Sequence, residues 1–275
     1  MANNPLQQYF RQPKIYISLP SQGLYNKPGA IQGDPAHLPV FGMTGMDEIM
    51  MKTPDALLTG ESTAKVINSC CPSITDPWDL SNLDTDLLLA SIRIATYGNE
   101  LQLADKCKKC GTDNEYSMDL NKLIDHYVQC QYDNTVVLQD LKITIRPLTY
   151  QQSTEFSTRN FQLQQQLNQT LIMEDDVEKK TIMNDLFQKL ATIRNEVFAL
   201  GIESIDTGKH IVTERAFIEE FIANADSSVM TAIGKQIEKN QKTWASPLQT
   251  VQCGHCGTET TLSINLDQSN FFVTA

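Results

Sequence analysis

The sequence of Cys107–Leu120, CKKCGTDNEYSMDL, recurs in altered form as CGHCGTETTLSINL at Cys253–Leu266. In each copy, two cysteines separated by two residues are followed by Gly-Thr, an acidic residue and a short alternating run that ends in Leu. Two thiolates at this spacing can bind one tetrahedral metal ion, and the glycine relieves backbone crowding where the chain reverses. One such turn supplies two ligands whereas a closed zinc site needs four. The two copies therefore predict one shared site.

Alternating residues also precede each cysteine pair, at residues 100–103 and 247–251. A period of two on both sides of each pair predicts two β-hairpins. Two such hairpins facing each other across a metal ion are typical of a zinc ribbon. Here the ribbon is split by a segment of about half the chain, whose ends must return to one place. A folded insertion is acceptable because the entropy cost of loop closure grows only logarithmically with length.

Cys107, Cys110, Cys253 and Cys256 are therefore the predicted ligands of a structural zinc ion. The alternatives are redox-active pairs and incidental buried cysteines, but neither pair lies in the βαβ pattern of a thioredoxin-like protein. Catalytic zinc keeps one position open, and four thiolates close the site. His255 lies inside the second pair and is interpreted as a solvent-facing residue. The odd number of seven cysteines is in keeping with a reducing compartment.

The insertion is predicted to begin with a tight hairpin of strands 135–138 and 141–145. A long Gln-rich helix is expected over Thr149–Ile172, with Thr149 as its N-cap. A second helix is expected over Val177–Leu200 and is predicted to be capped by Gly201. The short acidic turn between the helices predicts that they form an antiparallel hairpin.

Apolar residues at alternating spacings of three and four predict a coiled-coil seam on the second of these helices. We favour packing of this seam on the first helix over an intermolecular coiled coil, because the first helix is long enough to cover it. The first helix is less uniformly apolar, which leaves room for an additional partner. The candidate partner-binding residues are Phe156, Leu163, Leu167, Met183, Leu186, Leu190, Ile193 and Val197.

The overall prediction is an α+β chain, mainly helical, with short β-hairpins, a split four-cysteine zinc ribbon and an inserted antiparallel helical hairpin. After the helical hairpin we expect a short strand pair and two helices, the last capped by Ser227 or Ser228. The predicted domains are an N-terminal strand plus helical region at 1–106, the two ribbon halves at 107–134 and 247–275, and the insertion at 135–246, with its helical hairpin at about 149–200.

The acidic composition narrows the classes of function. A formal net charge of −11 argues against bulk attraction to nucleic acid or anionic lipid. Lys106, Lys108 and Lys109 beside the first cysteine pair nevertheless keep open the alternative of a zinc-ribbon nucleic-acid-binding or regulatory protein. No apolar run approaches the ~20 residues of a membrane-spanning helix, and the N-terminal residues lack the apolar core of a signal peptide. We therefore expect a chain that does not enter a membrane.

A zinc- or thiol-dependent enzyme is the third class considered. The sequence contains no nucleophile–base constellation, no phosphate loop and no paired carboxylates in a recognisable setting. Asp84 and Asp86 are interpreted as helix-start charges favoured by the helix dipole rather than as an acid/base pair. These observations favour a protein that is not an enzyme.

Several stretches resemble the T-even-type bacteriophage baseplate protein family. The resemblance is dense over about residues 6–120 and weaker between residue 150 and the second cysteine pair. The family includes components of the baseplate hub and hub-assembly chaperones of contractile-tailed phages. The similar stretches are YFRQPKIYI at 9–17, LPSQG at 19–23, KTPDALLTG at 52–60, DPW at 76–78, RIATYG at 93–98, the first cysteine pair, and RPLTY at 146–150.

The resemblance implies a non-enzymatic protein that acts in tail assembly through protein–protein contacts. Its expected partners are phage baseplate hub proteins, tape-measure proteins or both, and a homo-oligomer is compatible with the same role. We expect the chain to act in the host cytoplasm during assembly, either as a chaperone or as a part that stays in the baseplate of the virion tail.

Overall fold

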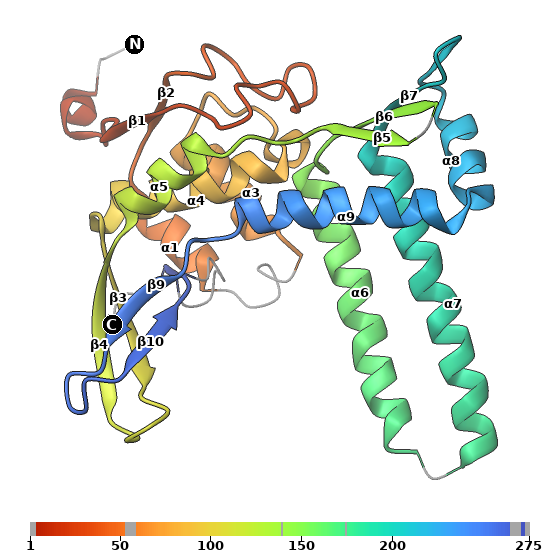
Figure 1. Ribbon diagram of the computed structural model, residues 1–275. Coiled ribbons are helices and arrows are strands. Elements are labelled where there is room, and N and C mark those ends of the chain that lie inside the picture. Colours follow the sequence, from red (N-terminus) through yellow and green to blue (C-terminus); the bar gives the residue numbers. More distant parts are fainter. Residues whose placement is uncertain (1–3, 53–58, 139, 174, 265–270, 273–275) are drawn as a thin grey trace. The chain divides into compact units, whose positions relative to one another are not determined.

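The computed structural model of the chain describes residues 4–52, 59–138, 140–173, 175–264 and 271–272 (Figure 1). It is an α+β structure in which helices dominate and the strands form short antiparallel sheets. The chain divides into two compact units, Met1–Cys130 with Trp244–Ala275, and Gln131–Thr243. The second unit is thus inserted into the sequence of the first. No described helix is both long and apolar enough to cross a membrane.

The first unit is mainly helical. It contains one two-stranded antiparallel sheet near its start, formed by β1 (Ile15–Ile17) and β2 (Leu38–Val40), with Ile15 opposite Val40. The two β-hairpins that carry the cysteine pairs belong to the same unit. Its helices are η1 (Pro5–Tyr9), α1 (Gly45–Met51), α3 (Glu61–Cys70), η2 (Pro77–Asp79), α4 (Asn82–Tyr97) and α5 (Leu120–Gln129).

Helix α4 lies at the core of the first unit. Leu87, Leu88 and Ile92 on this helix are inaccessible to solvent, and buried residues occupy most of its circumference. The hydroxyl of Ser81 accepts the backbone N–H of Leu83, in the first turn, and caps the N-terminus of the helix. Gly98 ends the helix with φ at 91°, a conformation that glycine adopts without strain. Ser81 and Gly98 are thus residue types suited to the two ends of this helix.

Asp84, in the first turn of α4, has a structural role. Its carboxylate accepts the backbone N–H of Ser21 at 3.0 Å and the side-chain amide of Asn26 at 2.9 Å. Burial raises the pKa of Asp84, although both of these hydrogen bonds act in the opposite direction. The carboxylate thereby fixes the turn around residues 21–26 on the start of the central helix.

A four-stranded antiparallel sheet and four helices form the second unit. The strand order is β5-β6-β7-β8, and Ile143 of β6 lies opposite Ile205 of β7. Isoleucines of the sheet pack against Ile218 and Ile233 from two of the helices to form the core. The elements are β5 (Thr135–Leu138), β6 (Leu141–Ile145), α6 (Tyr150–Leu171), α7 (Asp176–Gly201), β7 (Ile202–Asp206), β8 (Ile211–Val212), α8 (Arg215–Asn224) and α9 (Ser227–Trp244).

Helices α6 and α7 form the predicted antiparallel hairpin, and local side chains set its ends. Thr149 caps α6 in a reciprocal capping box with Gln152, as the sequence predicts for Thr149. At the turn, Asp175 accepts two backbone N–H groups of the first turn of α7. The ammonium group of Lys179 donates to the carbonyl of Leu171 at 2.7 Å, which satisfies one of the last carbonyls of α6.

Two predicted helix ends differ from the structure. Gly201 is the last residue of α7 rather than a left-handed cap, and the chain passes from it directly into β7. Its carbonyl accepts the N–H of Arg146 at 2.7 Å, so the residue that follows β6 supplies the hydrogen bond that a cap would have supplied. At the start of α9 the carboxylate of Asp226 accepts the N–H of Ser228 at 3.0 Å. The prediction that Ser227 or Ser228 caps this helix is therefore wrong.

The chain leaves the first unit and returns to it at the same point. The ring of Tyr127, near the end of α5, stacks on Trp244 with ring centroids 6.4 Å apart. The Nε2 atom of His126 lies 3.0 Å from the carbonyl oxygen of Ala245. These contacts bring the two ends of the insertion together, as the split arrangement of the cysteine pairs requires.

Candidate metal centre

Two β-hairpins of the first unit carry the four predicted ligands, one pair in each turn (Figure 1). Each hairpin is a separate two-stranded antiparallel sheet. The first is formed by β3 (Glu100–Lys106) and β4 (Asp113–Asp119), and the second by β9 (Gln249–Gln252) and β10 (Glu259–Leu262). The alternating residues on both sides of each pair therefore form the strands that the sequence predicts.

The structure brings the four cysteine sulfurs together. All four Sγ atoms lie within 4.8 Å of one another. The Sγ atoms of Cys107 and Cys256 are 3.7 Å apart, and those of Cys110 and Cys253 are 3.6 Å apart. A tetrahedral zinc ion with metal–sulfur bonds of about 2.3 Å requires sulfurs roughly 3.8 Å apart. The cluster is therefore compatible with one metal ion held between the hairpins.

The two turns have the same backbone hydrogen bonds. In the first turn the N–H of Cys107 donates to the carbonyl of Thr112 at 2.9 Å, and the N–H of Gly111 donates to the carbonyl of Cys107 at 2.8 Å. The second turn repeats both bonds, each at 2.9 Å, between Cys253, Thr258 and Gly257. The two glycines have φ of 74° and 66°, which explains why glycine follows each pair.

Sequence reasoning missed three polar residues beside the sulfurs. The hydroxyl oxygens of Thr112 and Thr258 lie 3.4 Å and 3.2 Å from the second sulfur of their own pair, where they can donate to a metal-bound thiolate. The side-chain oxygen of Asn114 accepts the N–H of Gly254 at 3.0 Å and links the two turns. The repeated Gly-Thr was a visible signal for the threonines, whereas the contact of Asn114 joins distant parts of the sequence.

Hydrogen bonds favour the thiolate form in the second turn. The Thr258 hydroxyl, together with its backbone N–H, lowers the pKa of Cys256 to about 6. The N–H of Cys256 is the largest influence on Cys253 and lowers the pKa of that thiol as well. In the first turn the N–H of Cys110 acts in the same direction on Cys107, but burial and neighbouring thiols outweigh it and the pKa of Cys107 is raised. A thiolate is the form that binds metal.

The other cysteines and His255 lie outside the cluster. His255 is exposed, in agreement with its interpretation as a solvent-facing residue. Cys70 and Cys71 are fully buried at the end of α3, and burial raises the pKa of these thiols to about 12 and 11. Burial also raises the pKa of Cys130. These three thiols are therefore protonated at neutral pH, and none of them belongs to the cluster of four sulfurs.

The candidate partner-binding residues lie on the helical hairpin. Leu163, Leu186 and Ile193 form a buried cluster between α6 and α7, so the coiled-coil seam packs on the first helix. The remaining candidates are partly buried: Phe156, Leu167, Leu190 and Val197 pack against this cluster, and Met183 lies on the same helix. Their contacts hold the hairpin together, and their binding to a partner stays a prediction.

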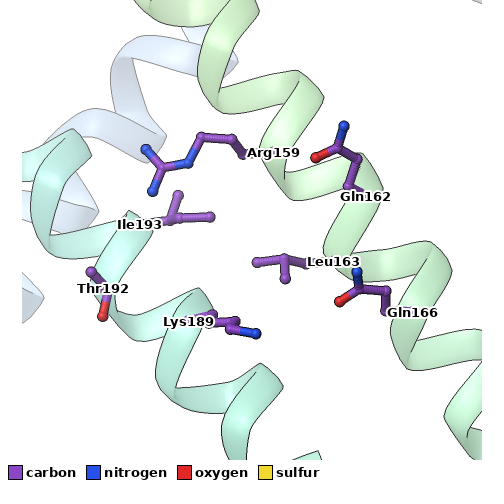
Figure 2. A pocket seen from close by; sticks show the side chains of 7 residues that line it. All are labelled: Arg159, Gln162, Leu163, Gln166, Lys189, Thr192 and Ile193. Atoms are coloured by element: carbon purple, nitrogen blue, oxygen red, sulfur yellow. The ribbon is translucent and has the colours of Figure 1, made fainter.

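A groove runs between these two helices (Figure 2). Leu163 and Ile193 project into the space between the helices and provide an apolar floor. The rim is polar, and the cavity volume is about 290 Å³. The lining residues are Arg159, Gln162, Leu163, Gln166, Lys189, Thr192 and Ile193.

The cations of the groove are paired within the hairpin. Arg159 binds Glu196 across the two helices at 2.6 Å, and Lys189 binds Asp185 on the same helix at 2.7 Å. The guanidinium of Arg159 also lies over the ring of Phe156, 5.5 Å from its centroid. The rim is therefore close to neutral, with side-chain amides as its main hydrogen-bonding groups.

Comparison with known proteins identifies the family. No curated protein and no solved structure matches the chain. Residues 46–273, which include both hairpins with their cysteine pairs and the whole insertion, match the family described as T4 bacteriophage base plate protein. The chain therefore belongs to the T4 bacteriophage base plate protein family, which assigns it a structural or assembly role in the phage baseplate.

Proposed function

We propose that the chain acts in assembly of the central baseplate hub or of the tape-measure complex, through protein–protein contacts and without catalysing a reaction. Its family implies contacts with other phage baseplate proteins and an association with the virion tail. The observation that supports this hub or tape-measure role is the groove between α6 and α7, with its apolar floor and a rim whose two cations are paired within the hairpin.

The groove suits a helix of a partner protein. A partner helix can place one large apolar side chain against Leu163 and Ile193, in the manner of helix-in-groove recognition. The amides of Gln162 and Gln166 can then hydrogen-bond beside it without the cost of desolvating a charge. Because α6 carries few charged residues, a partner helix can also contact the rest of its exposed face without desolvating many charges.

A structural zinc ion bound by the four clustered cysteines is part of this proposal. The thiolate donors and the sulfur–sulfur distances both suit zinc, and four thiolates leave no open position for catalysis. Four thiolates and one Zn²⁺ carry a net charge of 2−, and the exposed Lys106, Lys108 and Lys109 at the first turn offset it. Zinc would hold the two hairpins together at the base of the insertion.

Filling the groove tests the proposed function. The Gln162→Trp and Gln166→Trp variants place a large ring in the groove, whereas Gln164→Trp and Asn168→Trp place the same ring on exposed positions on the opposite side of α6. Tagged chains are recovered from phage-infected cells, and hub and tape-measure proteins are quantified by mass spectrometry. We expect at least about tenfold lower recovery for the groove variants alone.

Equal recovery of hub and tape-measure proteins by all four variants would remove the groove from the proposal. Recovery of neither protein by the wild-type chain would overturn the proposed function itself. Mass spectrometry of purified virions then distinguishes a permanent baseplate component from an assembly chaperone. A protein found in virions is a baseplate component, and a protein absent from virions but bound in cells is an assembly chaperone.

A further inference from the structure

The turn of the helical hairpin exposes apolar side chains that the seam does not explain. Among the described residues, Ile172 and Val177 are the two most exposed large apolar side chains, at 83% and 78%. Leu171 beside them is 50% exposed. All three lie beyond the buried cluster that joins α6 to α7, so they contribute nothing to that cluster. Exposed apolar side chains gathered at one place indicate an interaction site.

Side chains cap the two helix ends that flank the turn. The carboxylate of Asp175 accepts the N–H groups of Val177 at 2.9 Å and Glu178 at 3.1 Å. From the other side, Lys179 donates to the carbonyl of Leu171 at 2.7 Å. The described side chains are therefore presented from two capped helix ends. Such a preorganised surface loses less conformational entropy when it binds.

The charge around these side chains selects the kind of surface they can meet. The segment 171–180 contains four acidic residues and two basic residues, Lys179 and Lys180, so its formal charge is negative. Hydrogen bonds from the backbone N–H groups of Glu178 and Val177 lower the pKa of Asp175, which is therefore ionised at neutral pH. The described carboxylates of Asp175 and Glu178, on the same turn as the apolar side chains, are repelled by an anionic membrane surface. The net charge of −11 likewise disfavours a second copy of this chain as the partner.

We propose that this turn, defined by Leu171, Ile172, Asp175, Val177 and Glu178, docks into an apolar pocket ringed by lysine or arginine side chains on another baseplate protein. Ile172 and Val177 enter the pocket, and the carboxylates face the basic rim. The choice of a baseplate protein as partner rests on the proposed function, but the surface is separate from the groove. A partner can therefore use either surface or both.

The test compares full-length chains with purified baseplate proteins of the same phage, presented one at a time in biolayer interferometry. The double variant Ile172→Ser/Val177→Ser removes the apolar contact, and Glu178→Lys reverses one charge. Phe187→Ser is the matched control, because Phe187 is also exposed on α7 but lies away from the turn. We expect at least about tenfold weaker binding to one baseplate protein for the turn variants and unchanged binding for the control. Binding of the wild-type chain should also weaken as salt rises.

Unchanged affinity of the Ile172→Ser/Val177→Ser chain for every baseplate protein that binds the wild-type chain would overturn this inference. The inference would also be overturned if the double variant changed only the binding of the chain to anionic vesicles of phosphatidylcholine and phosphatidylglycerol. The same holds if it changed only the self-association of the chain, measured by sedimentation velocity. If Gln162→Trp abolishes binding and the turn variants do not, the groove stands and the turn is excluded. If the turn variants alone weaken binding, the turn is confirmed as the docking surface.

Discussion

Removal of one predicted ligand from each turn should abolish zinc binding at the proposed site. In the Cys107→Ser/Cys253→Ser chain only Cys110 and Cys256 remain, one on each hairpin. Zinc at closed thiolate sites of small domains contributes roughly 10–16 kcal/mol of apparent binding free energy, much of it as folding free energy. The link between the hairpins also closes a loop of more than 100 residues, which by chain entropy alone is worth about 5 kcal/mol. We expect the free energy of unfolding of the first unit to fall by at least that amount.

Two measurements check this prediction. Zinc per chain is measured by mass spectrometry after gel filtration, and unfolding is followed by circular dichroism in urea. We expect about one zinc ion per wild-type chain and almost none in the double variant, and a strong chelator should destabilise only the wild type. Cys130→Ser is the control, since it removes a thiol outside the cluster. One zinc ion retained in the double variant with wild-type stability would refute the shared site.

Two further predictions concern the folded core. Asp86→Asn should raise the free energy of unfolding at pH 7 by about 1–3 kcal/mol, because burial raises the pKa of Asp86 to about 6 and its ionised form opposes folding above that pH. The difference in the free energy of unfolding between the variant and the wild type should shrink as the pH falls from 7 toward 4. An equal difference at pH 7 and pH 4 in urea titrations would show that ionisation of Asp86 is not its cause. Leu186→Ala should destabilise the helical hairpin by about 2–5 kcal/mol, whereas Phe187→Ala at the next, exposed position should cost less than about 1 kcal/mol. Hydrogen exchange of α6 and α7 measures both, and equal losses of protection would contradict the assigned packing.

Features set by a few neighbouring residues could be predicted from the sequence. Thr149 was predictable as a cap because its hydroxyl bonds to a backbone N–H only three residues away. The hairpin at 135–145 follows from two short runs rich in β-branched residues that are separated by only two residues. The cysteine cluster was also predictable, although its halves are far apart, because a pair of thiolates is an incomplete zinc site that requires a second pair.

Features that join distant residues were not predictable in this way. The pairing of β6 with β7 converts a predicted hairpin and a predicted strand pair into one sheet, but no local pattern specifies which strands become neighbours. The same holds for Asn114, which meets Gly254 only in the folded chain. Gly201 ends a helix without a left-handed cap because Arg146, the residue that follows β6, supplies the missing hydrogen bond. In each case the deciding partner is far away in the sequence.

The split of the cysteine pairs between two distant hairpins has a consequence for biosynthesis. The first pair leaves the ribosome long before the second, and at roughly 5–20 residues per second the interval is on the order of ten seconds or more. The inserted unit, which has its own core, can fold during that interval. Four thiolates can converge on one ion only after both hairpins have been translated. Binding of the proposed zinc ion would therefore distinguish chains in which both hairpins have been made from chains that carry only the first.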